Sequence, residues 1–265
     1  MKHATAHGVR IAYDDRGTDS GRPTFLCLPG WGVNRGFFAP LAERLAARHR
    51  VITLDWRGHG DSGSASADFG HAELLEDALS VVDASGAESV IPIGQAHGAW
   101  VAVELANRLG ARVPAIVATS WLVLDPPPPF LGALDALQDE SKWQETRDRL
   151  FSMWTDGAPP EIAERARREM GAYGFEMWAR AGRCIAAEYA RHGNPLRAIS
   201  ALSPPPRFLH VFSQPKAPEF LAAQQSFADV NAWFEVRRLD AVSHFPPLEV
   251  PGATAAEIER FASAP

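Results

Sequence analysis

Short apolar runs that alternate with helix-like stretches constrain the fold of this chain most strongly. The runs are shorter than most helices and rich in β-branched and aromatic residues, which favours buried strands. Between two of them, segment 71–84 repeats apolar residues at helical spacing and carries acidic residues on its other face. The pattern predicts an α/β fold with a mostly parallel central sheet covered on both faces. The predicted strands are 24–28, 51–55, 90–93, 115–118, 208–212 and 233–239.

The strand pattern breaks at the four prolines Pro126 to Pro129, which predict a stiff polyproline spacer. From there to residue 194 the chain has the pattern of helices and turns. Its large side chains exceed what a solvated helical layer needs, so some are expected to line a pocket. We therefore predict a helical cap over 126–194, inserted into a core made of 1–125 and 195–265. The large side chains of this cap segment are Trp143, Trp154, Tyr173, Phe175, Met177 and Trp178.

Composition excludes several classes of protein. A chain of 265 residues with 46% apolar content can bury a sizeable core. Its net charge of −6 gives no basic stripe for a nucleic acid, and no stretch is apolar enough to span a membrane. Two cysteines are too few for a disulfide framework, and Cys27 lies in an apolar run where a buried thiol is expected. We expect a soluble cytoplasmic protein, monomeric or weakly dimeric.

A strand, a tight turn and a helix meet at 93–100, where the sequence is IGQAHGAW. This is the layout of a nucleophile elbow, which holds its central residue on a strained turn above the sheet. The central residue here is Ala96, which has no nucleophile, so acyl-enzyme chemistry at this position is excluded. An ordinary glycine-containing turn is the alternative.

Two other glycine-rich turns follow predicted strands. Segment 28–32 (LPGWG) stands where a fold with a nucleophile elbow supplies one main-chain donor to an oxyanion hole. This donor would be the main-chain N–H of Trp31, and the second donor would be the main-chain N–H of His97. Packing of Trp31 in a plain turn is the alternative. Segment 55–62 (DWRGHGDS) is better explained as a turn that Arg57, His59 and Asp61 stabilise by hydrogen bonds.

A histidine follows the last predicted strand and precedes a terminal helix over 254–262. Such a loop brings an imidazole over the carboxyl edge of the sheet, facing the elbow. His244 could therefore act as a general base near neutral pH. Its place after the elbow follows the chain order of hydrolases of this fold, although many single histidines are structural.

Together these motifs resemble those of the α/β-hydrolase fold, and specifically the cofactor-independent 2,4-dioxygenases of 3-hydroxy-4(1H)-quinolones. The resemblance extends from about residue 10 to the C-terminus and includes the cap. It is carried by 29–31 (PGW), 55–60 (DWRGHG), 97–100 (HGAW), 151–157 (FSMWTDG), 173–178 (YGFEMW), 212–215 (FSQP) and 244–246 (HFP).

The resemblance implies a bicyclic N-heteroaromatic substrate with a hydroxyl beside a ring carbonyl. His244 would remove the hydroxyl proton, and the resulting anion would react directly with O2. Ring cleavage would release carbon monoxide and leave an N-acylanthranilate, with no metal or other cofactor taking part. The protein would supply a base, a dry cavity and fixed dipoles. Residues implied to contact substrate are Gln95, Val33, Trp121, Trp154, Trp178 and Phe245.

Two positions depart from the family's catalytic pattern. Ala96 stands where the family carries a serine, which is compatible with a reaction that forms no serine adduct. Ser120 stands where the family carries the acid that orients its histidine. Ser120, Asp125 or Asp240, in that order, could take over this role. A third difference is Val33, in a place held by histidine in at least one relative, which suggests a more apolar pocket and a longer alkyl group at ring position 2.

Two alternative functions stay open at this stage. One is an esterase or amidase of the same fold whose nucleophile has been replaced by Ala96. The other is a non-catalytic protein that binds a hydrophobic heterocycle under its cap, as the loss of both serine and acid suggests.

Overall fold

One eight-stranded sheet organises the computed structural model, which describes residues 1–19, 21–65 and 67–264. The strand order is β1-β2-β4-β3-β5-β6-β7-β8; β2 pairs antiparallel with both of its neighbours, β1 and β4, and the other neighbouring strands pair parallel. The predicted α/β fold is confirmed. The strands are β1 Lys2–Ala6, β2 Val9–Arg16, β3 Thr24–Leu28, β4 Val51–Leu54, β5 Val90–Gln95, β6 Ala115–Thr119, β7 Arg207–Phe212 and β8 Phe234–Arg238.

Helices cover both faces of the sheet. Successive strand residues point to opposite sides, so a strand that is apolar throughout needs packing partners on both faces. Leu26 and Leu28 join a core with α2 and α3, whereas Phe25 and Cys27 join one with α1 and α11. The expected burial of Cys27 is confirmed. The helices around the sheet are α1 Ala39–Leu45, α2 His71–Ser85, α3 Ala99–Leu109, α8 Pro195–Ser200, α9 Pro218–Ala228, α10 Pro246–Glu249 and α11 Pro251–Ser263, with short 3-10 turns η1 Arg35–Phe38, η2 Ala96–Gly98 and η3 Gly110–Arg112.

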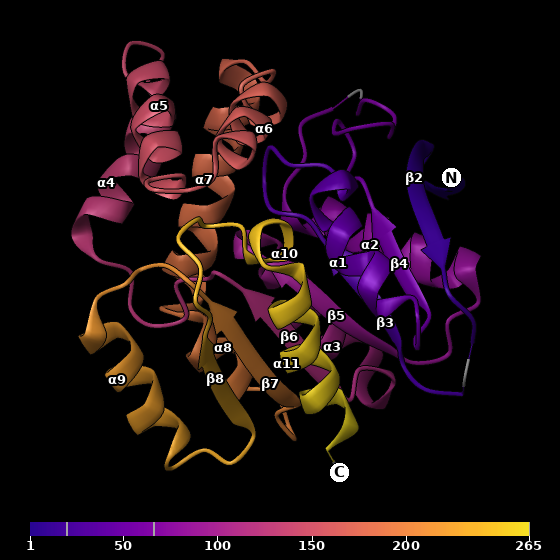
Figure 1. Ribbon diagram of the computed structural model, residues 1–265. Helices are drawn as coiled ribbons and strands as arrows, with labels where there is room; N and C mark the ends of the chain where they lie inside the picture. Colours follow the sequence, from indigo (N-terminus) through magenta and orange to yellow (C-terminus); the bar gives the residue numbers. More distant parts are fainter. Residues whose placement is uncertain (20, 66, 265) are drawn as a thin grey trace.

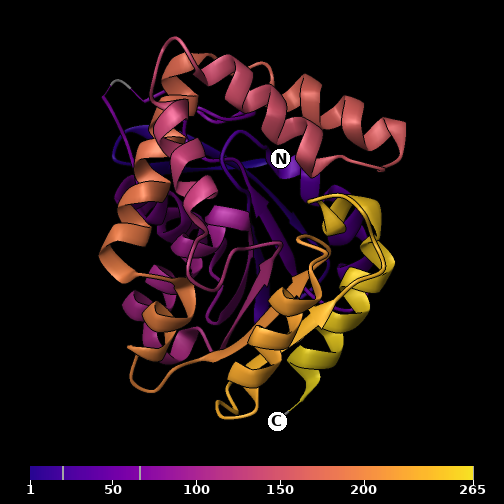
Figure 2. The ribbon, with the colours of Figure 1, turned by 90° about the vertical axis from the view of Figure 1, so that its left-hand side faces the viewer.

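Four consecutive helices between β6 and α8 stand together over one end of the sheet (Figures 1 and 2). They bury a small apolar cluster against Val33, Phe37 and Phe245, which come from core loops. The cluster joins this helical layer to the ends of β3 and β8. The four helices are α4 Pro128–Leu137, α5 Trp143–Trp154, α6 Pro160–Met170 and α7 Phe175–His192.

The structure differs from the sequence predictions at two places. The polyproline spacer ends early, because Pro128 and Pro129 form the first turn of α4, where a missing N–H costs nothing. The hairpin β1–β2 was not predicted. It is a half-exposed edge without the continuous apolar run that marks a buried strand. Within the described ranges, no helix combines the length and apolarity needed to cross a membrane.

Candidate functional site

A strained turn joins β5 to α3 through η2. Ala96 has a φ of 46°, in the left-handed region that alanine rarely adopts. The flanking glycines are required by close contacts: a Cβ on Gly94 would lie 2.4 Å from the Ala99 Cα, and one on Gly98 would lie 2.2 Å from the Pro29 oxygen. The turn therefore has the geometry of an elbow that presents its central residue, here only a methyl group.

The loop after β3 lies against this elbow. A Cβ on Gly30 would sit 3.8 Å from the Ala96 Cβ, which places the neighbouring Trp31 beside the turn. His59 holds the loop, because its Nε2 accepts the Gly32 N–H at 3.1 Å while its Nδ1 lies 3.0 Å from the Arg57 oxygen. Burial lowers the pKa of His59 to about 4, which keeps the ring neutral as this acceptor role requires.

The turn after β4 has the structural role that the sequence indicates, and it reaches further. Arg57 forms a buried ion pair with Asp77 of α2, and Asp61 pairs with Arg35 at 2.8 Å. These contacts tie the turn to α2 and to η1. Its hydrogen-bonding groups are thus engaged in holding the scaffold around the Trp31 loop.

His244 lies where the last core loop meets the cap. Its ring stacks on the Trp154 indole with centroids 5.4 Å apart and planes at 18°. Its main-chain N–H donates to the Trp154 oxygen at 2.8 Å, and the Phe245 ring is edge-on to it. Burial lowers the pKa of His244 to about 4, so the imidazole is neutral and able to accept a proton at neutral pH.

The loop that carries His244 is held by several hydrogen bonds. The Glu249 carboxylate accepts the N–H groups of Val242 and Ser243 at 3.0 and 2.7 Å. Gln214 donates to the Val242 oxygen and, at 3.2 Å, to the Met153 oxygen at the end of α5. The main chain around the imidazole is therefore fixed both to the core and to the cap.

The three residues proposed to orient His244 differ in their surroundings. Ser120 follows β6 with a φ of 51°, and its Oγ is buried without a partner. Asp125 instead accepts a hydrogen bond from Asn194 at 2.6 Å, and Asp240 is exposed. Among the described residues, none of the three forms a hydrogen bond with the His244 ring. Ser120 is the only one of them that is both buried and free to accept.

The segment after Ser120 is fixed by a buried histidine. The main-chain N–H of Trp121 donates to His210 Nε2 at 3.1 Å, and His210 Nδ1 lies 2.6 Å from the Gln224 Oε1. Burial lowers the pKa of His210 to about 4, despite the opposing hydrogen bond to Gln224. The Trp121 indole packs edge-on against Trp100 in the main core, away from the cap cluster that contains Val33, Trp178 and Phe245.

Several side-chain polar atoms are buried without a hydrogen-bond partner, although such atoms destabilise a fold unless something binds them. Some belong to predicted site residues, and one belongs to His71, which the sequence analysis assigned only to a helix. The Trp31 and His71 rings meet edge to face at 6.0 Å. Burial is the main cause that lowers the pKa of His97 to about 3. Among the described residues, these atoms are Trp31 Nε1, His71 Nε2, His97 Nδ1, Trp100 Nε1, Thr119 Oγ1, Ser120 Oγ, Trp121 Nε1, Glu169 Oε2 and Trp178 Nε1.

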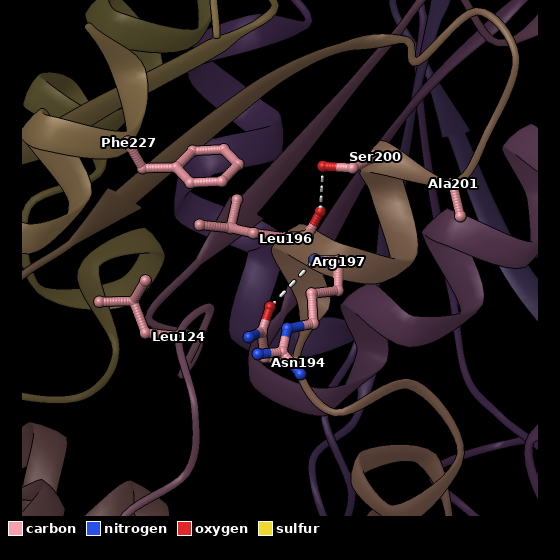
Figure 3. Close-up of a pocket in the computed structure, with 7 residues that line it drawn as sticks. All are labelled: Leu124, Asn194, Leu196, Arg197, Ser200, Ala201 and Phe227. Carbon is pink, nitrogen blue, oxygen red and sulfur yellow. Dashed lines mark hydrogen bonds between the residues drawn. The ribbon is translucent and has the colours of Figure 1, made fainter. Parts of the chain in front are cut away.

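A pocket of about 500 Å³ lies elsewhere, over α8 and α9 (Figure 3). Its polar side chains are paired locally: Asn194 accepts the Arg197 N–H, and Ser200 donates to the Leu196 oxygen. It includes none of the predicted site residues. Its remaining lining residues are Leu124, Ala201 and Phe227. In the part of the chain that the structure describes, no three His, Cys, Asp or Glu residues are grouped as metal ligands.

Comparison with known proteins places this geometry in context. Residues 25–257 match the model of the alpha/beta hydrolase family. The 2-heptyl-3-hydroxy-4(1H)-quinolone dioxygenase of Mycobacteroides abscessus is 40% identical, over 96% of this chain and 94% of the relative. The 1H-3-hydroxy-4-oxoquinoline 2,4-dioxygenase of Pseudomonas putida is 34% identical over the full length of both chains.

Solved structures agree with these matches. A variant of AqdC in complex with its substrate, the Pseudomonas quinolone signal, has a TM-score of 0.94 at 38% identity, covering 99% of this chain and 98% of its own. An esterase from Thermogutta terrifontis has a TM-score of 0.78 at 19% identity, covering 98% of this chain and 97% of its own. At that identity the second match shows a shared fold alone.

Proposed function

The chain belongs to the alpha/beta hydrolase family and, within it, to the 3-hydroxy-4-quinolone dioxygenases, and from that membership we propose that it cleaves a 2-alkyl-3-hydroxy-4(1H)-quinolone with O2. One substrate and one O2 give one N-acylanthranilate and one carbon monoxide. The observation that carries the proposal is the neutral imidazole of His244, held under the cap against the Trp154 indole.

The first step is a proton transfer. The His244 imidazole takes the proton of the 3-hydroxyl, and the electron pair of the O–H bond stays on the ring as a delocalised anion. The anion gives electrons to O2, and a peroxide forms at ring carbon 2. Its terminal oxygen attacks carbon 4, the O–O bond breaks, and carbon 3 leaves as carbon monoxide. Both oxygen atoms of O2 remain in the product, and the protonated His244 returns its proton to solvent.

Charge on oxygen needs donors that are already in place. The Trp31 and His97 N–H groups are suited to this role, because the loop after β3 packs on the elbow turn. Trp154, which stacks on the His244 ring, would shield it from water. Exclusion of water strengthens each of these electrostatic contacts and protects the anion from side reactions.

The apolar Val33 supports an alkyl substituent at ring position 2. It is buried in the cluster that joins Phe37 and Phe245 to the cap helices. A hydrocarbon chain is favoured in such surroundings by roughly 0.8 kcal/mol for each buried methylene. The M. abscessus relative is named for a 2-heptyl compound, which agrees with this choice.

Turnover of a 2-alkyl-3-hydroxy-4-quinolone tests the proposal. Mixed with the enzyme without O2 and then exposed to air, the compound should release carbon monoxide in proportion to the O2 consumed. His244→Ala should abolish turnover, while the control His7→Ala, at an exposed histidine, should retain it. Tight binding without O2 consumption would instead identify a non-catalytic binding protein. An esterase is not proposed, because Ala96 offers no nucleophile.

A further inference from the structure

A second imidazole is held next to the candidate site by a carboxylate of the cap. His71 is the first residue of α2, and its side chain is only 7% exposed. Its Nδ1 lies 3.5 Å from the Glu188 Oε1 on α7. The other oxygen of Glu188 lies 3.5 Å from His192 Nε2. The pair therefore links the core to the cap on the side of the site opposite to His244.

The other ring nitrogen of His71 is free. Nε2 is buried and has no hydrogen-bond partner. The ring lies edge-on to the Trp31 indole, at an interplanar angle of 85°. The loop that carries Trp31 packs on the elbow turn that carries His97. His71 thus belongs to the same group of side chains as the two residues whose main-chain N–H groups serve as oxyanion donors.

The sheet order separates the two histidines in space. The segment between β4 and α2 delivers His71, and the loop after β8 delivers His244. Strands β3 and β5, which carry the Trp31 loop and the elbow, lie between those strands in the sheet. A flat anion above the elbow would therefore have His244 on one side and His71 on the other.

Glu188 determines which hydrogen bond His71 can make. Burial alone would raise the pKa of Glu188. The contact with His71 and the nearby His71 and His192 together lower it by more, so the net shift of the pKa is downward and the carboxylate stays ionised. An ionised carboxylate at Nδ1 keeps a proton on that nitrogen. An oxygen anion at the buried, unpartnered Nε2 would give the ring a second acceptor, so that Glu188 and the anion would each accept one of its two N–H groups.

We propose that His71, positioned by Glu188, binds the substrate anion by donating a hydrogen bond from Nε2 to its negatively charged oxygen, as a third donor beside the Trp31 and His97 N–H groups. This inference rests on the proposed function, since it concerns the anion that His244 generates. It assigns a binding role to His71 and a positioning role to Glu188.

Anaerobic binding tests the inference apart from turnover. Two ligands are titrated without O2: a 2-alkyl-3-hydroxy-4-quinolone, which can form the anion, and the matching 2-alkyl-4-quinolone without the 3-hydroxyl, which cannot. We expect His71→Phe to weaken binding of the 3-hydroxy compound at least tenfold and to reduce the anion absorbance of the bound ligand. Binding of the compound without the hydroxyl should change less than threefold.

Two further variants keep the outcome clear. His71→Gln retains an N–H donor and should recover part of the affinity, whereas His49→Phe, at a buried histidine packed on Phe25, should bind both ligands like the parent protein. Equal losses for both ligands in the His71 variants, or no loss for either, would overturn the role of His71. Normal anaerobic binding without O2 consumption in the parent protein would overturn the proposed function alone.

Discussion

The imidazole of His244 and the indole of Trp154 are joined twice, by ring stacking at 5.4 Å and by a hydrogen bond between their main chains at 2.8 Å. Trp154 ends α5, a cap helix, and His244 belongs to a core loop. The position of the proposed base is therefore set by the cap as well as by the sheet. A change in the cap that leaves the sheet intact should still affect proton transfer.

Removal of the stacking partner tests this coupling. In Trp154→Ala the main-chain hydrogen bond can persist while the ring contact is lost. Aromatic pairs contribute about 0.5–1.5 kcal/mol beyond their area, so we expect kcat/KM for the quinolone to fall by roughly two- to tenfold. Steady-state O2 uptake measures this. Trp143→Ala removes a cap tryptophan that packs on Phe175 instead and serves as the control; equal losses in the two variants would contradict a specific role for Trp154.

The pH dependence of turnover should reveal a base with a low pKa. Burial lowers the pKa of His244 from 6.5 to about 4. The base must be neutral to accept a proton, so activity is lost only as the pH falls through this value. We expect the acid limb of kcat/KM to have its midpoint clearly below pH 6.5. A limb centred at pH 6.5 or above would show that the imidazole is not desolvated in the working enzyme.

Protein stability should fall over the same acidic range. Burial lowers the pKa of four histidines, to about 3 or about 4. Their rings take up protons more readily in the unfolded chain, near pH 6.5, so stability is complete above that pH and declines below it. Each ring contributes up to about 1.4 kcal/mol per pH unit. Urea unfolding at pH 7.5, 6 and 5 measures the decline, which His210→Gln should make shallower. The four are His59, His97, His210 and His244.

Glu249 should matter for catalysis through the loop that it holds. Its carboxylate accepts two main-chain N–H groups next to His244. The amide in Glu249→Gln can accept only one of them and turns its own N–H groups toward the other. We expect kcat to fall about tenfold with little change in KM, and stability to fall by about 1–3 kcal/mol.

A surface glutamate provides the comparison. Glu257 lies on α11 in a solvent-exposed ion pair with Arg260, so Glu257→Gln should leave kcat unchanged. If Glu249→Gln lowers only the melting temperature and not kcat, the clamp supports the fold without positioning the base.

The alternation of apolar runs was sufficient to predict the parallel part of the sheet, because buried strands require continuous apolar sequence. The same rule missed β1, which is buried on one face only, and β2, whose buried run is limited to Ile11, Ala12 and Tyr13. His244 was proposed as the base from its place in the chain order. His71 was not, because its role depends on Glu188, a residue far along the chain that only the folded cap brings near. Long-range pairs of this kind leave no local pattern.

Restoring a carboxylate at position 120 tests which group faces His244. The Ser120 Oγ is buried without a partner, and aspartate tolerates the left-handed backbone there better than most residues. In Ser120→Asp, we expect an imidazole–carboxylate contact that raises the pKa of His244 and moves the acid limb of kcat/KM to higher pH, by about one unit or more. Ser120→Ala should slow turnover without such a shift. An unchanged acid limb in Ser120→Asp, with the fold intact by circular dichroism, would mean that this side chain does not reach the base.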